Sequence, residues 1–75
     1  MLNKREQEIL YFISLNKSPK EIASILGVRE QKTLAPATIQ AIITKQLYVK
    51  FGVYSVSNLI EKASFLGLIP FSLEP

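Results

Sequence analysis

The chain has no cysteine, no histidine, no tryptophan and no aspartate among its 75 residues. The missing cysteine excludes disulfides and thiolate metal sites, and the missing histidine excludes imidazole ligands, histidine general bases and histidine-dependent triads. Six glutamates are the only acidic side chains. A binding role is favoured over catalysis, so we expect no enzyme activity, no metal, no cofactor and no small-molecule ligand.

Long hydrophobic runs are also lacking. Residues 9–13 (ILYFI) are too few to span a bilayer, and Glu6 and Glu8 interrupt what would have to be the core of a signal peptide. We therefore expect no membrane association and a cytoplasmic location. A length of 75 residues suits one small domain, near the lower limit for a single core without disulfides or metals.

The charge balance is modestly basic, with nine Lys and Arg residues and a net charge of +3. Such a surplus is compatible with an anionic partner but does not require one. The surplus is concentrated between residues 17 and 50. The basic residues there are Lys17, Lys20, Arg29, Lys32, Lys45 and Lys50, against Glu21 and Glu30.

The most informative motif is a short helix that starts after Ser18. The Ser18 hydroxyl can accept a hydrogen bond from the first turn, Pro19 lacks an N–H where none is needed, and Glu21 can reach back to the Ser18 amide. Gly27 predicts the end of this helix, because glycine readily adopts the left-handed closing conformation. The expected inner face is Ile22, Ala23 and Leu26.

A first helix precedes it, because Asn3 and Glu6 form another capping pattern. We expect this helix to run to about Leu15 and to bury Ile9, Leu10 and Ile13. Residues 29–33 are polar and without periodicity, which predicts an exposed connection after the second helix.

The third helix is predicted to begin at Pro36, to continue to about Phe51 and to end at Gly52. Its inner stripe is expected to be Ile39, Ile42, Ile43, Leu47 and Phe51. A fourth helix should start after Ser55 or Ser57 and stop at Gly67. Its buried residues are expected to be Val56, Leu59, Ile60 and Ala63.

Four short helices predict an all-α domain at residues 1–67, followed by an apolar tail at residues 68–75. Residues 53–57 alternate weakly between apolar and polar side chains, which leaves open a strand and a winged variant of the fold. The tail either packs back on the domain or belongs to an interface. Two short helices in sequence, the second started by a proline, favour a helix-turn-helix.

Four blocks, in order, resemble the LuxR/GerE-type DNA-binding domains of bacterial transcriptional regulators. Residues 2–10 (LNKREQEIL) resemble "L-T-x-R-E-x-E-V-L", and residues 19–28 (PKEIASILGV) resemble "N-K-E-I-A-x-x-L-G-I". Residues 34–39 (LAPATI) resemble "L-S-P-R-T-V", and residues 50–53 (KFGV) resemble "K-L-G-V". The resemblance implies a four-helix helix-turn-helix domain that binds double-stranded DNA.

The resemblance also implies roles for particular residues. The third helix, about 36–51, would enter the major groove as the recognition helix, and the fourth helix would form a homodimer or heterodimer. Base contacts are expected from Gln40, Ala41 and Thr44, whose side chains suit adenine edges and thymine methyl groups. Backbone contacts are expected from Ser18, Lys20, Arg29, Lys32, Thr38, Lys45 and Tyr48. The expected dimer interface is Val56, Leu59, Ile60 and Ala63.

The chain departs from that family in three places. The connection at residues 29–33 carries roughly five or six additional residues, where about three or four are usual. Between Thr38 and Lys50 the chain is about one residue longer, so the helix is either longer or carries a bulge that rotates later side chains by about 100°. The family's early basic or histidine residues in this helix are replaced by Gln40, Ala41 and Ile42 or Ile43.

Two other readings remain open. A LuxR-like protein-interaction module would bind another regulator through its fourth helix and tail, which the weak charge of the third helix favours. A sigma-factor-like helix-turn-helix overlaps with the first two helices, but residues 50–53 and a fourth helix count against it.

Overall fold

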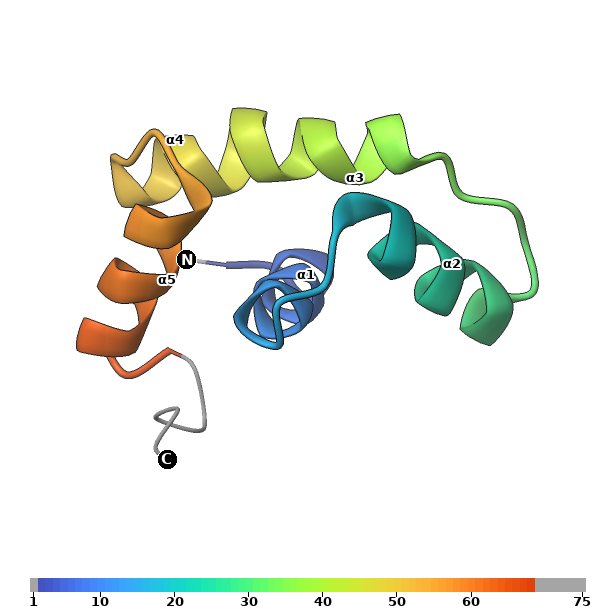
Figure 1. The fold of residues 1–75 in the computed structure, drawn as a ribbon, viewed down its shortest axis with the longest axis horizontal. Coiled ribbons are helices and arrows are strands. Elements are labelled where there is room, and N and C mark those ends of the chain that lie inside the picture. The colour runs from blue at the N-terminus through green and yellow to red at the C-terminus, as the bar shows by residue number, and fades with distance from the viewer. Residues whose placement is uncertain (1, 69–75) are drawn as a thin grey trace.

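A computed structural model describes residues 2–68, in which all the regular secondary structure is helical (Figure 1). The elements are α1 (Lys4–Ser14), α2 (Pro19–Glu30), α3 (Pro36–Ile42), the π-helical segment η1 (Ile43–Leu47), α4 (Tyr48–Phe51) and α5 (Val56–Phe65). Because α3, η1 and α4 follow one another without a break, residues 36–51 form one body, here called the long helix. The all-α prediction is confirmed for residues 2–68.

The strand considered for residues 53–57 is wrong, because these residues form a bend and the start of α5. Of the expected apolar tail, only residue 68 is among the described residues, and residues 69–75 lie outside them.

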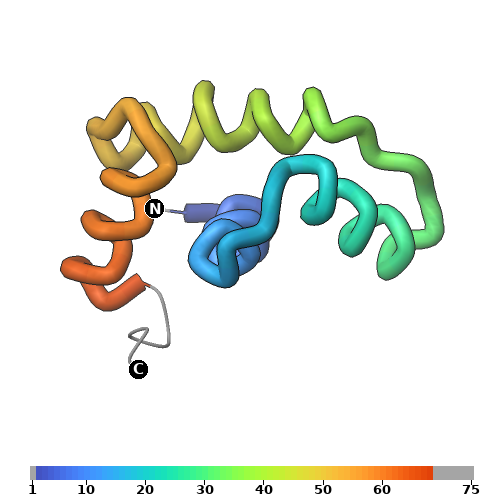
Figure 2. Tube along the Cα trace, in the orientation of Figure 1, coloured from blue at the N-terminus to red at the C-terminus, as the bar shows by residue number. Residues whose placement is uncertain are grey.

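The long helix runs along one side of the molecule and the other helices lie against its inner side (Figures 1 and 2). Helix α2 packs on α3, α1 packs on η1, and α5 turns back from the end of α4 to contact both α4 and α1. The shared core consists of Ile9, Leu10, Ile13, Ile22, Ala23, Leu26, Ile39, Ile43, Leu47, Phe51, Val53, Leu59 and Ala63.

The predicted capping boxes of α1 and α2 are confirmed. The Asn3 side-chain oxygen accepts from the Glu6 N–H at 2.8 Å, and the Glu6 carboxylate accepts from the Asn3 N–H at 2.9 Å. The corresponding distances between Ser18 and Glu21 are 3.2 and 2.9 Å. Both starts are therefore set by contacts between residues three positions apart.

The predicted end of α2 at Gly27 is wrong. The helix continues to Glu30 and closes at Gln31, which adopts the left-handed conformation with φ 58°. Arg29 therefore lies in the last turn of α2, and the connection to α3 is residues 31–35. Ion pairs from Arg29 to Glu8 and from Glu30 to Arg5 hold this last turn against α1, which the sequence pattern did not show.

Gly27 has a different role from the one predicted. The chain folds back so that the Lys32 N–H donates to the Gly27 carbonyl at 3.0 Å. A Cβ at position 27 would lie 2.7 Å from the Lys32 carbonyl oxygen, closer than side-chain carbons come to backbone. The absence of a side chain therefore allows the connection to pass over α2, and the glycine itself stays helical.

The long helix begins at Pro36 and ends at Gly52, as predicted, with Gly52 at φ 67°. The open question of its register is settled by a bulge. In η1 the Tyr48 N–H donates to the Ile43 carbonyl, five residues back in place of four. Such a wide turn holds one more residue than an α-helical turn.

The bulge follows from the spacing of the buried side chains. Ile39, Ile43, Leu47 and Phe51 are all buried and lie four residues apart. In an α-helix four residues turn the chain by about 400°, so a row with this spacing drifts by about 40° at each step. One wide turn removes about 100° of the accumulated drift and keeps the whole row in the core.

Helix α5 starts after Ser55, the first of the two predicted caps, whose hydroxyl accepts from the Asn58 N–H at 3.2 Å. Its last turn leads into Gly67, which has φ 73°. Within residues 2–68, no helix has the length and apolar character needed to cross a membrane.

Candidate nucleic-acid interface

The solvent side of the long helix is organised in rows, because the bulge gives this helix an average repeat of about four residues. Opposite the buried row lies the row Ala37, Ala41, Lys45 and Val49, here called the outer row. Ala37, Lys45 and Val49 are exposed and Ala41 is half-buried. Two small side chains in the first half of the outer row leave the helix backbone accessible to a partner.

The three residues predicted to contact bases lie on or beside the outer row. Gln40 is exposed, whereas Ala41 and Thr44 are half-buried. The Thr44 hydroxyl donates to the Gln40 carbonyl at 3.0 Å, so its hydrogen is used within the helix. Gln40 is therefore the most accessible of the three, and Thr44 can offer mainly its methyl group.

Two further exposed residues, Gln46 and Val49, were not among the predicted contacts. Val49 is 71% exposed, and Gln46 is exposed on the row next to the outer row. The signal that could have found them is the four-residue spacing of Ile39, Ile43, Leu47 and Phe51. Taken as a fixed row, that spacing places Gln46 and Val49 outside.

All of the predicted backbone contacts except Tyr48 are exposed: Ser18, Lys20, Arg29, Lys32, Thr38 and Lys45. Lys20 and Lys45 form no salt bridge with any of residues 2–68, so their charges are available to an anion. Tyr48 is only half-exposed and packs against the core, so part of its ring is not on the surface.

The start of α2 is partly occupied by its own carboxylate. The Ser18 N–H donates to Glu21, and this hydrogen bond, together with the nearby Lys17 charge, holds the pKa of Glu21 below its usual value. A phosphate at this helix start would meet that negative charge. Ser18 is thus used for capping, and Lys20 is the stronger candidate of the two for a phosphate contact.

Arg29 and Lys32 belong to a group of ion pairs between α1 and the end of α2. Arg29 lies 2.8 Å from Glu8, and Lys32 lies 3.8 Å from Glu30. Arg5 donates to Glu30 at 2.8 Å, which is the main reason why the pKa of Glu30 is lowered. The charges of Arg29 and Lys32 are therefore partly neutralised within the chain.

An ion pair between the exposed Lys50 and the buried Glu6 ties the far end of the long helix to the start of α1. Lys50 Nζ lies 2.7 Å from a carboxylate oxygen of Glu6, whose side chain is 1% exposed. Burial acts to raise the pKa of Glu6, but the hydrogen bonds from Lys50 and Asn3 outweigh it, so the pKa is lowered. This pair fixes α4 relative to α1.

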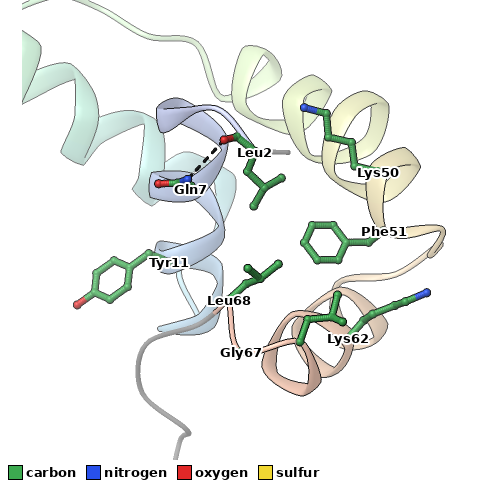
Figure 3. Close-up of a pocket in the computed structure, with 9 residues that line it drawn as sticks. Leu2, Gln7, Tyr11, Lys50, Phe51, Lys62, Gly67 and Leu68 are labelled. Carbon is green, nitrogen blue, oxygen red and sulfur yellow. Dashed lines mark hydrogen bonds between the residues drawn. The ribbon is translucent and has the colours of Figure 1, made fainter.

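A separate apolar groove lies between α1, α4 and the end of α5 (Figure 3). Its volume is about 670 Å³. Leu2, Phe51 and Leu68 point toward one another across it, and Lys62 lies at its edge (Figure 3). The groove is on the inner side of the long helix and is distinct from the outer row.

The expected dimer interface needs a correction. Leu59 and Ala63 are 0% exposed, because they pack into the core of their own chain. They are not available to a second chain, whereas Val56 is exposed and Ile60 is partly buried against the core. The apolar spacing of α5 predicted burial, which is confirmed for Leu59 and Ala63 through the packing of α5 on α1 and α4 but is wrong for Val56, and the interface had been implied by the resemblance alone.

No group of three or more metal-binding side chains occurs among residues 2–68. No family model, curated protein or solved structure matches the chain.

Proposed function

We propose that this chain is a sequence-specific DNA-binding domain of a bacterial-type transcriptional regulator, with the long helix as its recognition helix. The observation that carries the proposal is the first part of the outer row together with Gln40: small, polar and basic side chains (Ala37, Gln40, Ala41 and Lys45) cover the solvent side of a helix whose opposite side is anchored in the core, and the exposed Val49 follows only at the far end. The four blocks that resemble LuxR/GerE-type domains support it.

The arrangement suits the major groove. Ala37 and Ala41 allow the helix backbone to approach the base edges closely, and the Gln40 amide matches the donor and acceptor of adenine. Lys45, one turn further along, and Lys20, at the start of α2, supply charge for phosphates on either side. A homodimer or heterodimer would place two such helices on successive half-sites about one helical turn apart.

The test is selection of bound duplexes from a random pool, followed by affinity measurements on the enriched sequence over a range of salt concentrations. Lys45→Ala should weaken binding and lower the slope of log affinity against log salt by about one, because one phosphate contact is lost. Lys62→Ala, the same charge change on α5, should leave both unchanged. Failure of the wild-type chain to enrich any duplex would refute DNA binding.

The apolar groove favours a second candidate, a protein-interaction module. Its walls include Leu2, Phe51 and Leu68, and Lys62 supplies positive charge at the edge. These features fit a short apolar segment of another regulator that carries an acidic residue. Under this alternative Lys62→Glu should abolish a hetero-complex seen by light scattering, and Lys45→Glu should not.

A further inference from the structure

The wide turn in the long helix decides which residues reach the surface. If residues 36–51 were α-helical throughout, the row through Ile39 and Ile43 would meet Gln46 and Lys50. Leu47 and Phe51 would then be turned away from the core by about 80° and 120°. Instead, Leu47 is fully buried, Phe51 is nearly so, and Gln46 and Lys50 are exposed.

The same geometry shows what the helix would be with one residue fewer. Removal of Gln46 brings Leu47 to three residues and Phe51 to seven residues after Ile43. Spacings of four, three and four keep apolar side chains on one face of a regular α-helix. The buried row therefore fits either a regular helix with one residue fewer between Ile43 and Leu47 or a helix with a wide turn there, and Thr44, Lys45 and Gln46 are the three residues within that span.

Gln46 differs from its neighbours in what its side chain does. It lies in the second half of the long helix, beside Lys45 of the outer row, its side chain is exposed, and its amide makes no hydrogen bond to residues 2–68. The Thr44 hydroxyl, by contrast, is held by the Gln40 carbonyl. An exposed amide with its full donor and acceptor capacity is the kind of group that reads an adenine edge.

We propose that the wide turn is a one-residue insertion that presents Gln46 to DNA, and that Gln46 is a base-contacting, specificity-determining residue of the recognition helix. This inference rests on the proposed DNA-binding function. The insertion leaves the core unchanged and places a second amide beside the outer row, on the side opposite Gln40.

The first experiment compares duplexes selected by the wild-type chain and by Gln46→Ala, with Gln7→Ala on α1 as the matched control. Gln46→Ala should lose its preference at one base pair of each half-site and bind the wild-type motif about tenfold more weakly. Gln7→Ala should select the wild-type motif. An unchanged motif and affinity for Gln46→Ala would overturn the assignment, even with DNA binding itself established.

The second experiment needs no DNA and tests the insertion directly. Deletion of Gln46 should give a chain that unfolds cooperatively at a midpoint temperature equal to or above that of the wild type. Deletion of Ser24, an exposed residue of the regular helix α2, should lower the midpoint strongly, because it turns Leu26 out of the core by about 100°. If the two deletions lower the midpoint temperature by the same amount, the wide turn is not a one-residue insertion.

The two experiments separate the possible failures. If the wild-type chain selects no duplex, the proposed function fails and the role of Gln46 fails with it, while the deletion pair still reports on the wide turn. If the wild-type chain selects a motif that Gln46→Ala also selects, only the role of Gln46 fails.

Discussion

The two helices of the proposed helix-turn-helix are specified in different ways. Helix α2 carries a complete start signal, with Ser18, Pro19 and Glu21 in contact within one turn. The long helix begins at Pro36, its cap residue Ala35 makes no side-chain capping hydrogen bond, and it contains a wide turn at η1. Its continuity comes from a row of buried side chains, which contact α1, α2 and α5.

The comparison teaches that a helix can be defined at its end or along its length. Where the backbone groups of the first turn are satisfied locally, the start is a property of a few consecutive residues. Where they are not, packing decides the path of the helix, and it can impose a π turn that no local preference favours. The predictions below test this contrast, from the largest expected effect to the smallest.

Leu47→Ala should have the largest effect, because Leu47 is fully buried in η1 and helps to hold the wide turn in place. We expect a loss of about 3 kcal/mol in the free energy of unfolding. Val49→Ala, two residues away and exposed, should change it by less than about 0.5 kcal/mol. Urea denaturation followed by circular dichroism measures both, and a loss below about 1 kcal/mol for Leu47→Ala would contradict the dependence on packing.

Lys50→Met should lower the free energy of unfolding by about 2 kcal/mol at pH 7. This loss is smaller than for a fully buried ion pair, because Lys50 is partly exposed. The lowered pKa of Glu6 means that its ionised form stabilises the fold above the ordinary glutamate value of about 4.3. This stabilisation is lost as the pH falls through the lowered pKa. The difference in the free energy of unfolding between Lys50→Met and the wild type should therefore become smaller at acidic pH.

Urea titrations at neutral and acidic pH measure the effect of Lys50→Met. Lys62→Met removes a lysine of α5 that forms no salt bridge with residues 2–68, and it should show no such pH dependence. If Lys50→Met lowers the free energy of unfolding by the same amount at both pH values, the charge of Glu6 does not contribute to the stability of the pair.

Gly27→Ala should destabilise the chain by about 1 kcal/mol or more, although alanine is the better helix former by about that amount. The reason is the Lys32 carbonyl, which would lie 2.7 Å from the new Cβ and belongs to backbone that must move. Ser24→Ala in the same helix is the control and should be neutral or slightly stabilising. A Gly27→Ala variant as stable as Ser24→Ala would mean that the connection yields freely.

The smallest effects concern the helix starts. Ser18→Ala should lower the free energy of unfolding by about 1 kcal/mol, because a hydrogen bond to the first turn of α2 is lost. Ala35→Ser should raise the free energy of unfolding by about 0.5 kcal/mol, since Ala35 already has the extended conformation of a cap residue. Ser57→Ala, which changes no cap, is the control. Thermal unfolding of the three variants gives the comparison, and opposite signs for Ser18→Ala and Ala35→Ser are required.

Prediction from sequence succeeded where the signals are short-range. The starts of α1, α2 and the long helix, and the stop at Gly52, were predicted at the observed residues. For α5, Ser55 was one of two predicted caps. Each start depends on a side chain or a proline within three residues of the group that it satisfies, and the stop depends on a glycine that adopts the left-handed conformation.

Prediction was incomplete where contacts between residues far apart in the sequence determine the end of a helix or the role of a buried face. Gly27 looked like a stop because glycine commonly closes helices, but Arg29 and Glu30 extend α2 by pairing with α1. The helical spacing of Leu59 and Ala63 predicted a buried face, and the resemblance assigned that face to a dimer interface. That pattern marks a buried face without telling whether the same chain or another one covers it.

By itself, the sequence determined the all-helical fold of residues 2–68, the capped starts of α1, α2 and α5, and the four-residue spacing of the row from Ile39 to Phe51. Tertiary structure decided that α2 continues past Gly27, that the long helix accommodates its spacing through a wide turn, and that Arg29, Lys32 and Lys50 are paired. The physical reason is range: capping acts through hydrogen bonds between neighbours, whereas ion pairs and core packing join residues such as Glu6 and Lys50, 44 positions apart. The outer row and Gln46 owe their position to that packing.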